Sequence, residues 1–137
     1  GWCYGQAGLI ATLNRVRAPF NVTAAGQAAA IAALGDTEFV TRSRQHNAIW
    51  RDWMAAECAA LSNHGVKVIP SWANFLMILF EGNCSAEAAY NGLMDEGYIV
   101  RWLPGQGLGS GLRITIGTED ENRGVMAALR KILEANA

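Results

Sequence analysis

The sequence predicts an α/β fold with an α+β-like arrangement, in which a long connecting helix leads into a small, mostly antiparallel sheet covered by helices. Two observations lead to this prediction. Residues that can share one helix face recur at spacings of three and four from about Thr37 to about Leu61, which indicates a helix about 36 Å long at roughly 1.5 Å per residue. From Val66 onward the segments read as strand, strand, helix, strand, strand, helix, an order typical of a sheet with helices packed against it.

The first 35 residues are expected to hold a brief strand and two helices. Trp2 to Tyr4 is an aromatic segment that reads as a strand, too short to be stable without neighbours. Ala7 to Asn14 has the length of a short helix, and Pro19 prevents its continuation. The alanine-rich stretch from Thr23 or Ala24 to Leu34 predicts a second helix, because alanine has the highest helix propensity.

Asp36 or Thr37 is expected to cap the long helix, and two strands are expected after it. They cover Val66 to Ile69 and Asn74 to Phe80, separated by Pro70. The second strand is apolar on both faces, which predicts a central position in the sheet.

The C-terminal half of the predicted sheet begins after a helix from Ala86 to Glu96, which Ser85 caps and Gly97 ends. Short strands are expected over Tyr98 to Arg101 and Leu112 to Ile116, with a flexible glycine-rich loop between them. A final helix follows a capping box formed by Thr118 and Glu121, and its apolar face carries Val125, Leu129, Ile132 and Leu133.

Two arginines are expected to meet on this last pair of strands. If the strands form a hairpin, Arg101 closes the first and Arg113 opens the second, so that both guanidinium groups lie at the loop end. Leu112, Ile114 and Ile116 alternate with Arg113, which directs the apolar set to the core and Arg113 away from it. Converging guanidinium groups can bind a carboxylate or a phosphate. The alternative is a pair of surface arginines bonded to water or to a stray carboxylate.

Composition excludes several classes of function. The chain of 137 residues is 51% hydrophobic and 17% charged, which indicates one folded domain. A net charge of -1 leaves no basic surface for nucleic acid, and no apolar run approaches the roughly 20 residues of a membrane helix. The odd number of widely spaced cysteines predicts a reducing, cytoplasmic location and no metal site; they are Cys3, Cys58 and Cys84.

Five segments, taken together and in order, carry a family resemblance. They are Gly-Trp-Cys-Tyr-Gly at residues 1–5, Arg-Val-Arg-Ala-Pro-Phe-Asn-Val at 15–22, Pro-Ser-Trp-Ala-Asn-Phe at 70–75, Leu-Arg-Ile-Thr-Ile-Gly-Thr at 112–118 and Thr-Glu-Asp-Glu-Asn-Arg at 118–123. This series resembles the C-terminal portion of the pyridoxal-phosphate aminotransferases of fold type I, and most closely the histidinol-phosphate aminotransferases.

The resemblance implies a domain organisation and a function. Residues 1–35 would be a remnant of the large cofactor domain with the interdomain region, and residues 36–137 would be the long linking helix with the C-terminal small domain. The implied reaction is transamination between histidinol phosphate and 2-oxoglutarate in histidine biosynthesis, with pyridoxal phosphate as cofactor. Small anionic substrates and a homodimer are the partners expected from it.

Carried across residue by residue, the resemblance assigns the substrate's anionic end to Arg113, with Arg101 beside it. Tyr4 and Asn74 match positions near the active site, and Asn21 lies in a loop that approaches it close to the subunit interface. Residue chemistry alone favours Asn21 as a turn residue or a helix-capping residue over a contact in the active site. Trp72 departs from the glutamine more usual at its position.

No catalytic residue is expected within the chain itself. An aminotransferase needs a lysine to form a Schiff base with its cofactor, and neither Lys67 nor Lys131 matches that residue, which is expected upstream. We therefore expect the chain alone to be inactive. The alternatives are a regulatory domain that senses amino acids, a structural domain that dimerises through its alanine-rich helix, and a related pyridoxal-phosphate lyase or decarboxylase.

Overall fold

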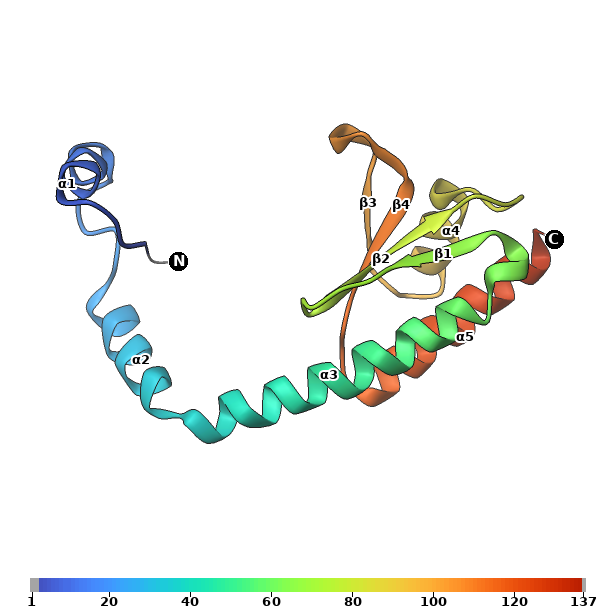
Figure 1. Ribbon diagram of the computed structural model, residues 1–137, viewed down its shortest axis with the longest axis horizontal. Coiled ribbons are helices and arrows are strands. Elements are labelled where there is room, and N and C mark those ends of the chain that lie inside the picture. The colour runs from blue at the N-terminus through green and yellow to red at the C-terminus, as the bar shows by residue number, and fades with distance from the viewer. Residues whose placement is uncertain (1–2, 137) are drawn as a thin grey trace. The chain divides into compact units, whose positions relative to one another are not determined.

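A four-stranded sheet is the centre of residues 41–137 in the computed structural model, which describes residues 3–136 (Figure 1). Its strand order is β1-β2-β4-β3, and every neighbouring pair is antiparallel. The predicted fold class and the internal position of the second strand are confirmed. The strands are β1 (Val66–Ile69), β2 (Phe75–Phe80), β3 (Arg101–Leu103) and β4 (Leu108–Thr115).

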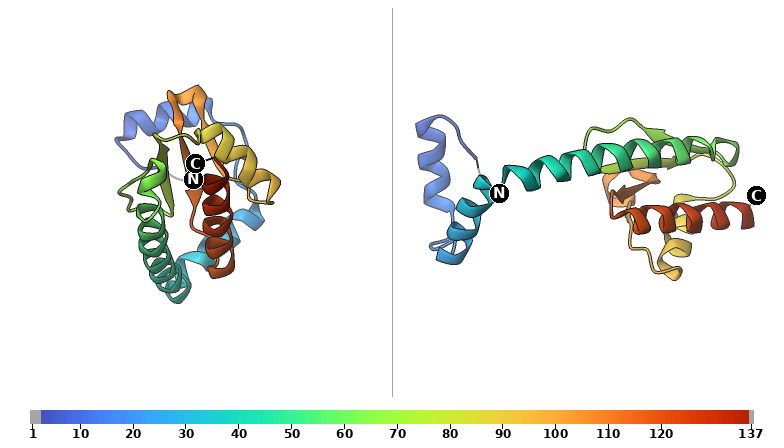
Figure 2. Two further views of the ribbon diagram at one scale, coloured as in Figure 1. Left: turned by 90° about the vertical axis from the view of Figure 1, so that its right-hand side faces the viewer. Right: turned by 90° about the horizontal axis from the view of Figure 1, so that it is seen from below.

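Three helices pack on one side of this sheet (Figure 2). They are α3 (Thr37–Ala59), α4 (Ala86–Asp95) and α5 (Glu119–Ala135). Alternation along the strands sends one set of side chains towards them, because successive residues of a strand point to opposite faces. The resulting core joins Leu76, Ile78, Leu112 and Ile114 of the sheet to Met54 and Cys58 of α3, Leu93 of α4 and Leu129 of α5.

The helix starts follow the predicted caps. The Phe39 amide donates to the Asp36 side chain at 2.9 Å, and Ser85 caps α4 through its hydroxyl. At α5 the capping box is complete. The Thr118 backbone amide donates to the Glu121 carboxylate at 2.8 Å, which lowers the pKa of Glu121. Local sequence signals therefore fix where the helices begin.

The opposite side of the sheet is not covered by α3, α4 or α5 (Figure 2). We call it the open face. Its apolar members are half-buried or exposed, with Ile69 at 38%. Strand register and alternation assign to the open face the side chains of Lys67, Ile69, Phe75, Met77, Leu79, Arg101, Arg113 and Thr115.

Residues 1–40 form the other compact unit and contain α1 (Ala7–Val16) and α2 (Ala24–Gly35). Both predicted helices are confirmed, and neither contains a buried residue. The predicted strand at Trp2 to Tyr4 was wrong for its described part, because Cys3 and Tyr4 are not in a β-strand. Trp2 lies outside the described residues. Across residues 3–136, no helix is both long and apolar enough to cross a membrane.

The predicted boundaries of the last two strands were also wrong. β3 begins at Arg101, because the Tyr98 amide still donates to the carbonyl of Leu93 at the end of α4. The glycine-rich segment is a strand for much of its length, since Pro104–Gln106 form a tight turn and β4 begins at Leu108. Gly107, at φ 73°, completes that turn.

Candidate functional site

Arg101 and Arg113 face each other directly across β3 and β4. Directly opposite residues of an antiparallel pair project from the same face of a sheet, so both side chains belong to the open face. The predicted meeting of the two arginines is confirmed by this register. Its predicted place was wrong, because β3 starts at Arg101 and the turn follows Leu103. The arginines lie at the end of the ribbon remote from the turn.

Arg113 is half-buried, and its guanidinium group lies against an aromatic ring. The Cζ atom is 5.0 Å from the centroid of the Phe75 ring. Its Nε atom is buried and has no hydrogen-bond partner in the described residues. Because Nε is shielded, the two terminal nitrogens are the donors through which Arg113 can reach a ligand.

The positive charge of this pair is not balanced by a carboxylate of any residue that the structure describes. Salt bridges elsewhere in residues 3–136 use other basic side chains, whereas neither Arg101 nor Arg113 forms one. Arginine keeps its charge at any working pH, and like charges directly opposite each other destabilise a strand pair. The arrangement can therefore accept an anion, whose charge would offset the repulsion.

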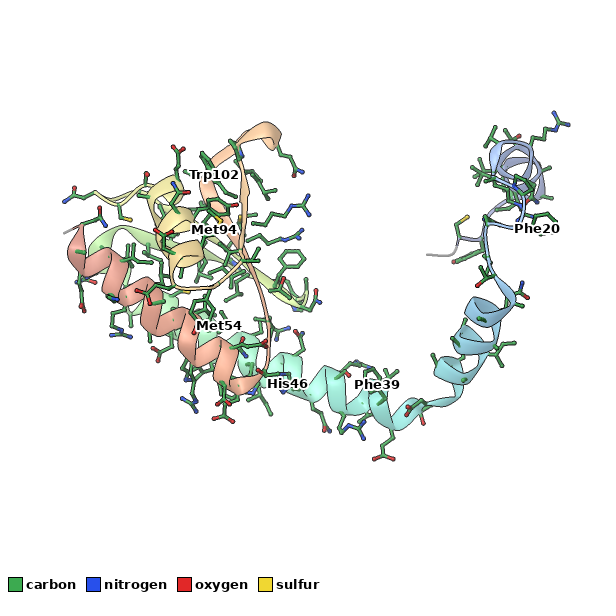
Figure 3. All side chains as sticks on the ribbon, turned by 180° about the vertical axis from the view of Figure 1, so that it is seen from behind. Phe20, Phe39, His46, Met54, Met94 and Trp102 are labelled. Carbon is green, nitrogen blue, oxygen red and sulfur yellow. The ribbon has the colours of Figure 1, made fainter. Side chains whose placement is uncertain are left out.

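The segment after β4 is held in place by an unusual set of hydrogen bonds around Gly117. The Gly117 amide donates to Asn122 Oδ1 at 2.8 Å, and Asn122 Nδ2 donates to the Gly117 carbonyl at 3.0 Å. His46 belongs to α3 (Figure 3). Its Nε2 lies 2.8 Å from that carbonyl oxygen. Asn122 is 1% exposed. These contacts join α3, the end of β4 and α5.

The prediction from sequence missed both Phe75 and this Gly117 cluster. An available signal was Asn122, a polar residue on the α5 face that also carries Val125 and Leu129. A buried amide needs hydrogen-bond partners, which points to a nearby backbone segment. Phe75 carried no comparable signal, because its contact with Arg113 depends on the register between β2 and β4.

Asn74 immediately precedes β2, and its side chain is exposed. Its backbone carbonyl accepts from the Ile116 amide at 2.8 Å, which extends the pairing of β2 with β4 by one residue. Asn74 also lines a cavity of about 470 Å³ with α3 residues that include His46 and Asn47. The two arginines are not among the residues that line this cavity.

Asn21 and Tyr4 belong to residues 1–40. Asn21 Oδ1 accepts a hydrogen bond from Arg17 Nη1 at 2.6 Å. Thr23 rather than Asn21 caps α2, since its hydroxyl accepts from the Gly26 amide at 3.0 Å. Tyr4 is 88% exposed. Their assignment to an active site remains a prediction.

Side chains that could act as nucleophiles are poorly disposed for it. Lys131 Nζ lies 2.5 Å from a carboxylate oxygen of Glu96, and Lys67 is exposed on β1. Burial raises the pKa of the Cys58 thiol to about 12 and also raises the pKa of Cys84. A thiol of this kind stays protonated near neutral pH and is unreactive. None of these four side chains is therefore an activated nucleophile.

Comparison with known proteins gives a consistent family. The family described as aminotransferase class I and II matches residues 1–129. The chain is 65% identical over 133 residues to a histidinol-phosphate aminotransferase of Sphingopyxis alaskensis, covering 97% of the chain and 36% of that relative. It is 53% identical over 133 residues to a histidinol-phosphate aminotransferase of Zymomonas mobilis, with the same coverage. The chain therefore spans about a third of the length of these relatives.

Solved structures of the same kind share the fold. A histidinol-phosphate aminotransferase from Sinorhizobium meliloti, in complex with pyridoxal-5'-phosphate, matches with a TM-score of 0.82 and 27% identity, covering 95% of this chain and 35% of that one. The histidinol-phosphate aminotransferase from Clostridium acetobutylicum matches with a TM-score of 0.82 and 26% identity, covering 93% of this chain and 38% of that one.

Proposed function

The chain belongs to aminotransferase class I and II, and from this premise we propose that the protein containing it transfers an amino group between histidinol phosphate and 2-oxoglutarate, in histidine biosynthesis. Support comes from the relatives named histidinol-phosphate aminotransferase, at 65% and 53% identity. Within that protein, Arg113 and Arg101 bind the anionic group of the substrate.

The observation that carries this proposal is the unbalanced arginine pair on the open face. Arg101 and Arg113 are opposite each other in register, without a salt bridge to any described residue. Both proposed substrates are anions, one through a phosphate and one through carboxylates. Guanidinium groups bind either kind of group through paired, charge-assisted hydrogen bonds. Arg113 is the main contact because it is the more buried of the two.

Pyridoxal phosphate is the cofactor we propose for the full-length protein, with support from the Sinorhizobium meliloti complex. When bound, it supplies the carbonyl group that accepts the amino group. The residues present here do not fit its covalent attachment, because Lys131 is paired with Glu96 and Lys67 is an exposed strand residue. What this chain contributes is substrate binding and orientation, with Asn74, Asn21 and Tyr4 as further candidates near the site.

We also propose that residues 1–35 belong to a large cofactor domain and that residues 36–137 form the linking helix and small domain of a cytoplasmic homodimer. The absence of buried residues in α1 and α2 supports this. Apolar helix surfaces of globular proteins are normally buried. An apolar surface of this kind is suited to packing against the remainder of the protein or a second subunit.

The test is a transamination assay on the full-length protein. We expect histidinol phosphate to be a much better amino donor than the other amino acids or amines, with 2-oxoglutarate as acceptor. A protein that transfers amino groups only from an unrelated donor would contradict the substrate proposal. A parallel incubation of residues 1–137 with pyridoxal phosphate and borohydride should give no selective modification of Lys67 or Lys131, and a single stoichiometric adduct on either would refute the assignment of the reactive lysine.

A further inference from the structure

We infer that Phe75 is a positioning residue for substrate binding, and that its ring holds the Arg113 guanidinium group in the orientation that receives the anion. This inference rests on the proposed function. It adds to the site an aromatic side chain that has no polar atom of its own. Phe75 acts through Arg113 and does not need to touch the substrate.

Strand register brings the two side chains together. In the pairing of β2 with β4, Phe75 lies opposite Thr115 and Met77 lies opposite Arg113. Phe75 is therefore the diagonal neighbour of Arg113 on the open face, a distance that long and aromatic side chains can bridge. The separation of 5.0 Å between Cζ and the ring centroid is that of a cation–π contact.

Arg113 needs such a contact because no salt bridge to a described residue fixes its position. An arginine side chain loses considerable rotamer freedom when it is ordered, and a carboxylate partner usually compensates for that loss. No described carboxylate plays this role here. The buried, unpartnered Nε atom shows that the guanidinium group is packed on its inner side without a hydrogen bond. The Phe75 ring supplies a planar surface that restricts the group and leaves its terminal nitrogens available.

The neighbouring residues restrict how far Arg113 could rearrange. Gly111 lies on the open face of β4, like Arg113, and is opposite Leu79. A Cβ atom at Gly111 would come within 3.0 Å of the Met77 sulfur and 3.3 Å of Leu79 Cδ2, so these side chains already fill the space on that side. The ring of Phe75 bounds the guanidinium group on the other side.

Replacing the ring should weaken anion binding while the positive charge stays in place. We expect Phe75→Leu in the full-length enzyme to raise KM for 2-oxoglutarate between about twofold and thirtyfold, the range that corresponds to a cation–π contact at an exposed or a desolvated site. Phe75→Tyr keeps the ring and should restore KM to near the wild-type value. The change in kcat should be smaller, because the substitution disturbs binding.

A matched control is available on the same strand. Phe80→Leu makes the same chemical change on the face that packs against the helices, where Phe80 is 6% exposed. It should lower the melting temperature and leave KM for 2-oxoglutarate unchanged. The inhibition constant of glutarate, which has two carboxylates and no oxo group, gives a measure of binding that does not depend on turnover, and it should rise with KM in Phe75→Leu.

The outcomes separate the two proposals. If the wild-type enzyme does not transfer amino groups, the proposed function fails and this inference fails with it. If the wild-type enzyme is active but Phe75→Leu binds 2-oxoglutarate and glutarate normally, or if Phe75→Tyr is as weak as Phe75→Leu, the positioning role alone is overturned. Should Phe75→Leu not fold, Phe75→Met provides the same comparison.

Discussion

Replacing Arg113 by lysine tests the centre of the proposed site. The substitution keeps one positive charge opposite Arg101 on the open face, but a lysine ammonium cannot offer two parallel donors to one carboxylate or phosphate. The neighbouring core is undisturbed, because Leu112 and Ile114 on either side of Arg113 point to the opposite face and are buried there. We therefore expect a loss of activity without a matching loss of stability.

The size of the loss follows from the hydrogen bond that disappears. A hydrogen bond to a charged group contributes roughly 1.5 to 3 kcal/mol, and about 1.4 kcal/mol corresponds to a tenfold change in rate or affinity. Removing one such bond should lower kcat/KM by roughly tenfold to a hundredfold or more. Arg101→Lys should have a smaller effect, since Arg101 is exposed and its guanidinium group stacks on no aromatic ring among the described residues.

Steady-state kinetics of the full-length enzyme with histidinol phosphate and 2-oxoglutarate, together with thermal melting curves, provides the assay. An Arg113→Lys enzyme with wild-type kcat/KM would remove Arg113 from the site. A large fall in melting temperature would show instead that Arg113 serves the fold. A greater loss of kcat/KM in Arg101→Lys than in Arg113→Lys would reverse the roles that burial assigns to the two arginines.

Three further predictions concern the chain itself. Residues 1–137 should self-associate, because Val16, Ile31 and other apolar side chains of residues 1–40 are exposed; sedimentation showing a monomer at all concentrations would contradict this. The free energy of unfolding should fall at high pH because of the Cys58 thiol, whose pKa rises from 9.0 to about 12 on folding. The stabilising contribution of the protonated thiol is fully present below about pH 9 and is lost between about pH 9 and 12. Urea titrations give the free energy of unfolding at each pH, and its dependence on pH should differ between wild type and Cys58→Ala only in that interval. Asn122→Ala should reduce the free energy of unfolding by about 2 to 4 kcal/mol, since it breaks two hydrogen bonds and leaves the Gly117 amide without its partner. Asn136→Ala, an exposed asparagine near the end of the same helix, is the control and should change it by less than about 0.5 kcal/mol.

Helices could be predicted closely because their signals are local. Asp36, Ser85 and Thr118 each satisfy backbone amides within three residues of themselves, so the start of a helix can be read from a short stretch of sequence. The strand at residues 98–101 could not be placed in the same way. Its boundaries depend on the end of α4, where the Leu93 carbonyl still accepts from the Tyr98 amide, and on which residues of β4 are available to pair.

The site could be predicted only in part, for a related reason. Alternation along a strand correctly places Arg113 on the face opposite Leu112 and Ile114, and this needs no knowledge of a partner strand. The contact with Phe75 requires the register between β2 and β4, which joins residues 38 positions apart. Sequence spacing does not determine such a register, so the contact between the Phe75 ring and Arg113 is evident only in the folded chain.

The edge position of β3 links anion binding to local opening of the sheet. β3 has three residues and is bordered by β4 on one side only, and short edge strands open more readily than central ones. Arg101 begins this strand and faces Arg113. Without a bound anion, repulsion between the two guanidinium groups favours separation of β3 from β4. At the proposed site, a bound anion would neutralise the pair and would bind the closed ribbon more tightly than the open one, which shifts that equilibrium towards the closed state. Under the proposed function, occupancy of the site is thereby coupled to the order of the β3–β4 ribbon, and the substrate would complete the edge of the sheet that binds it.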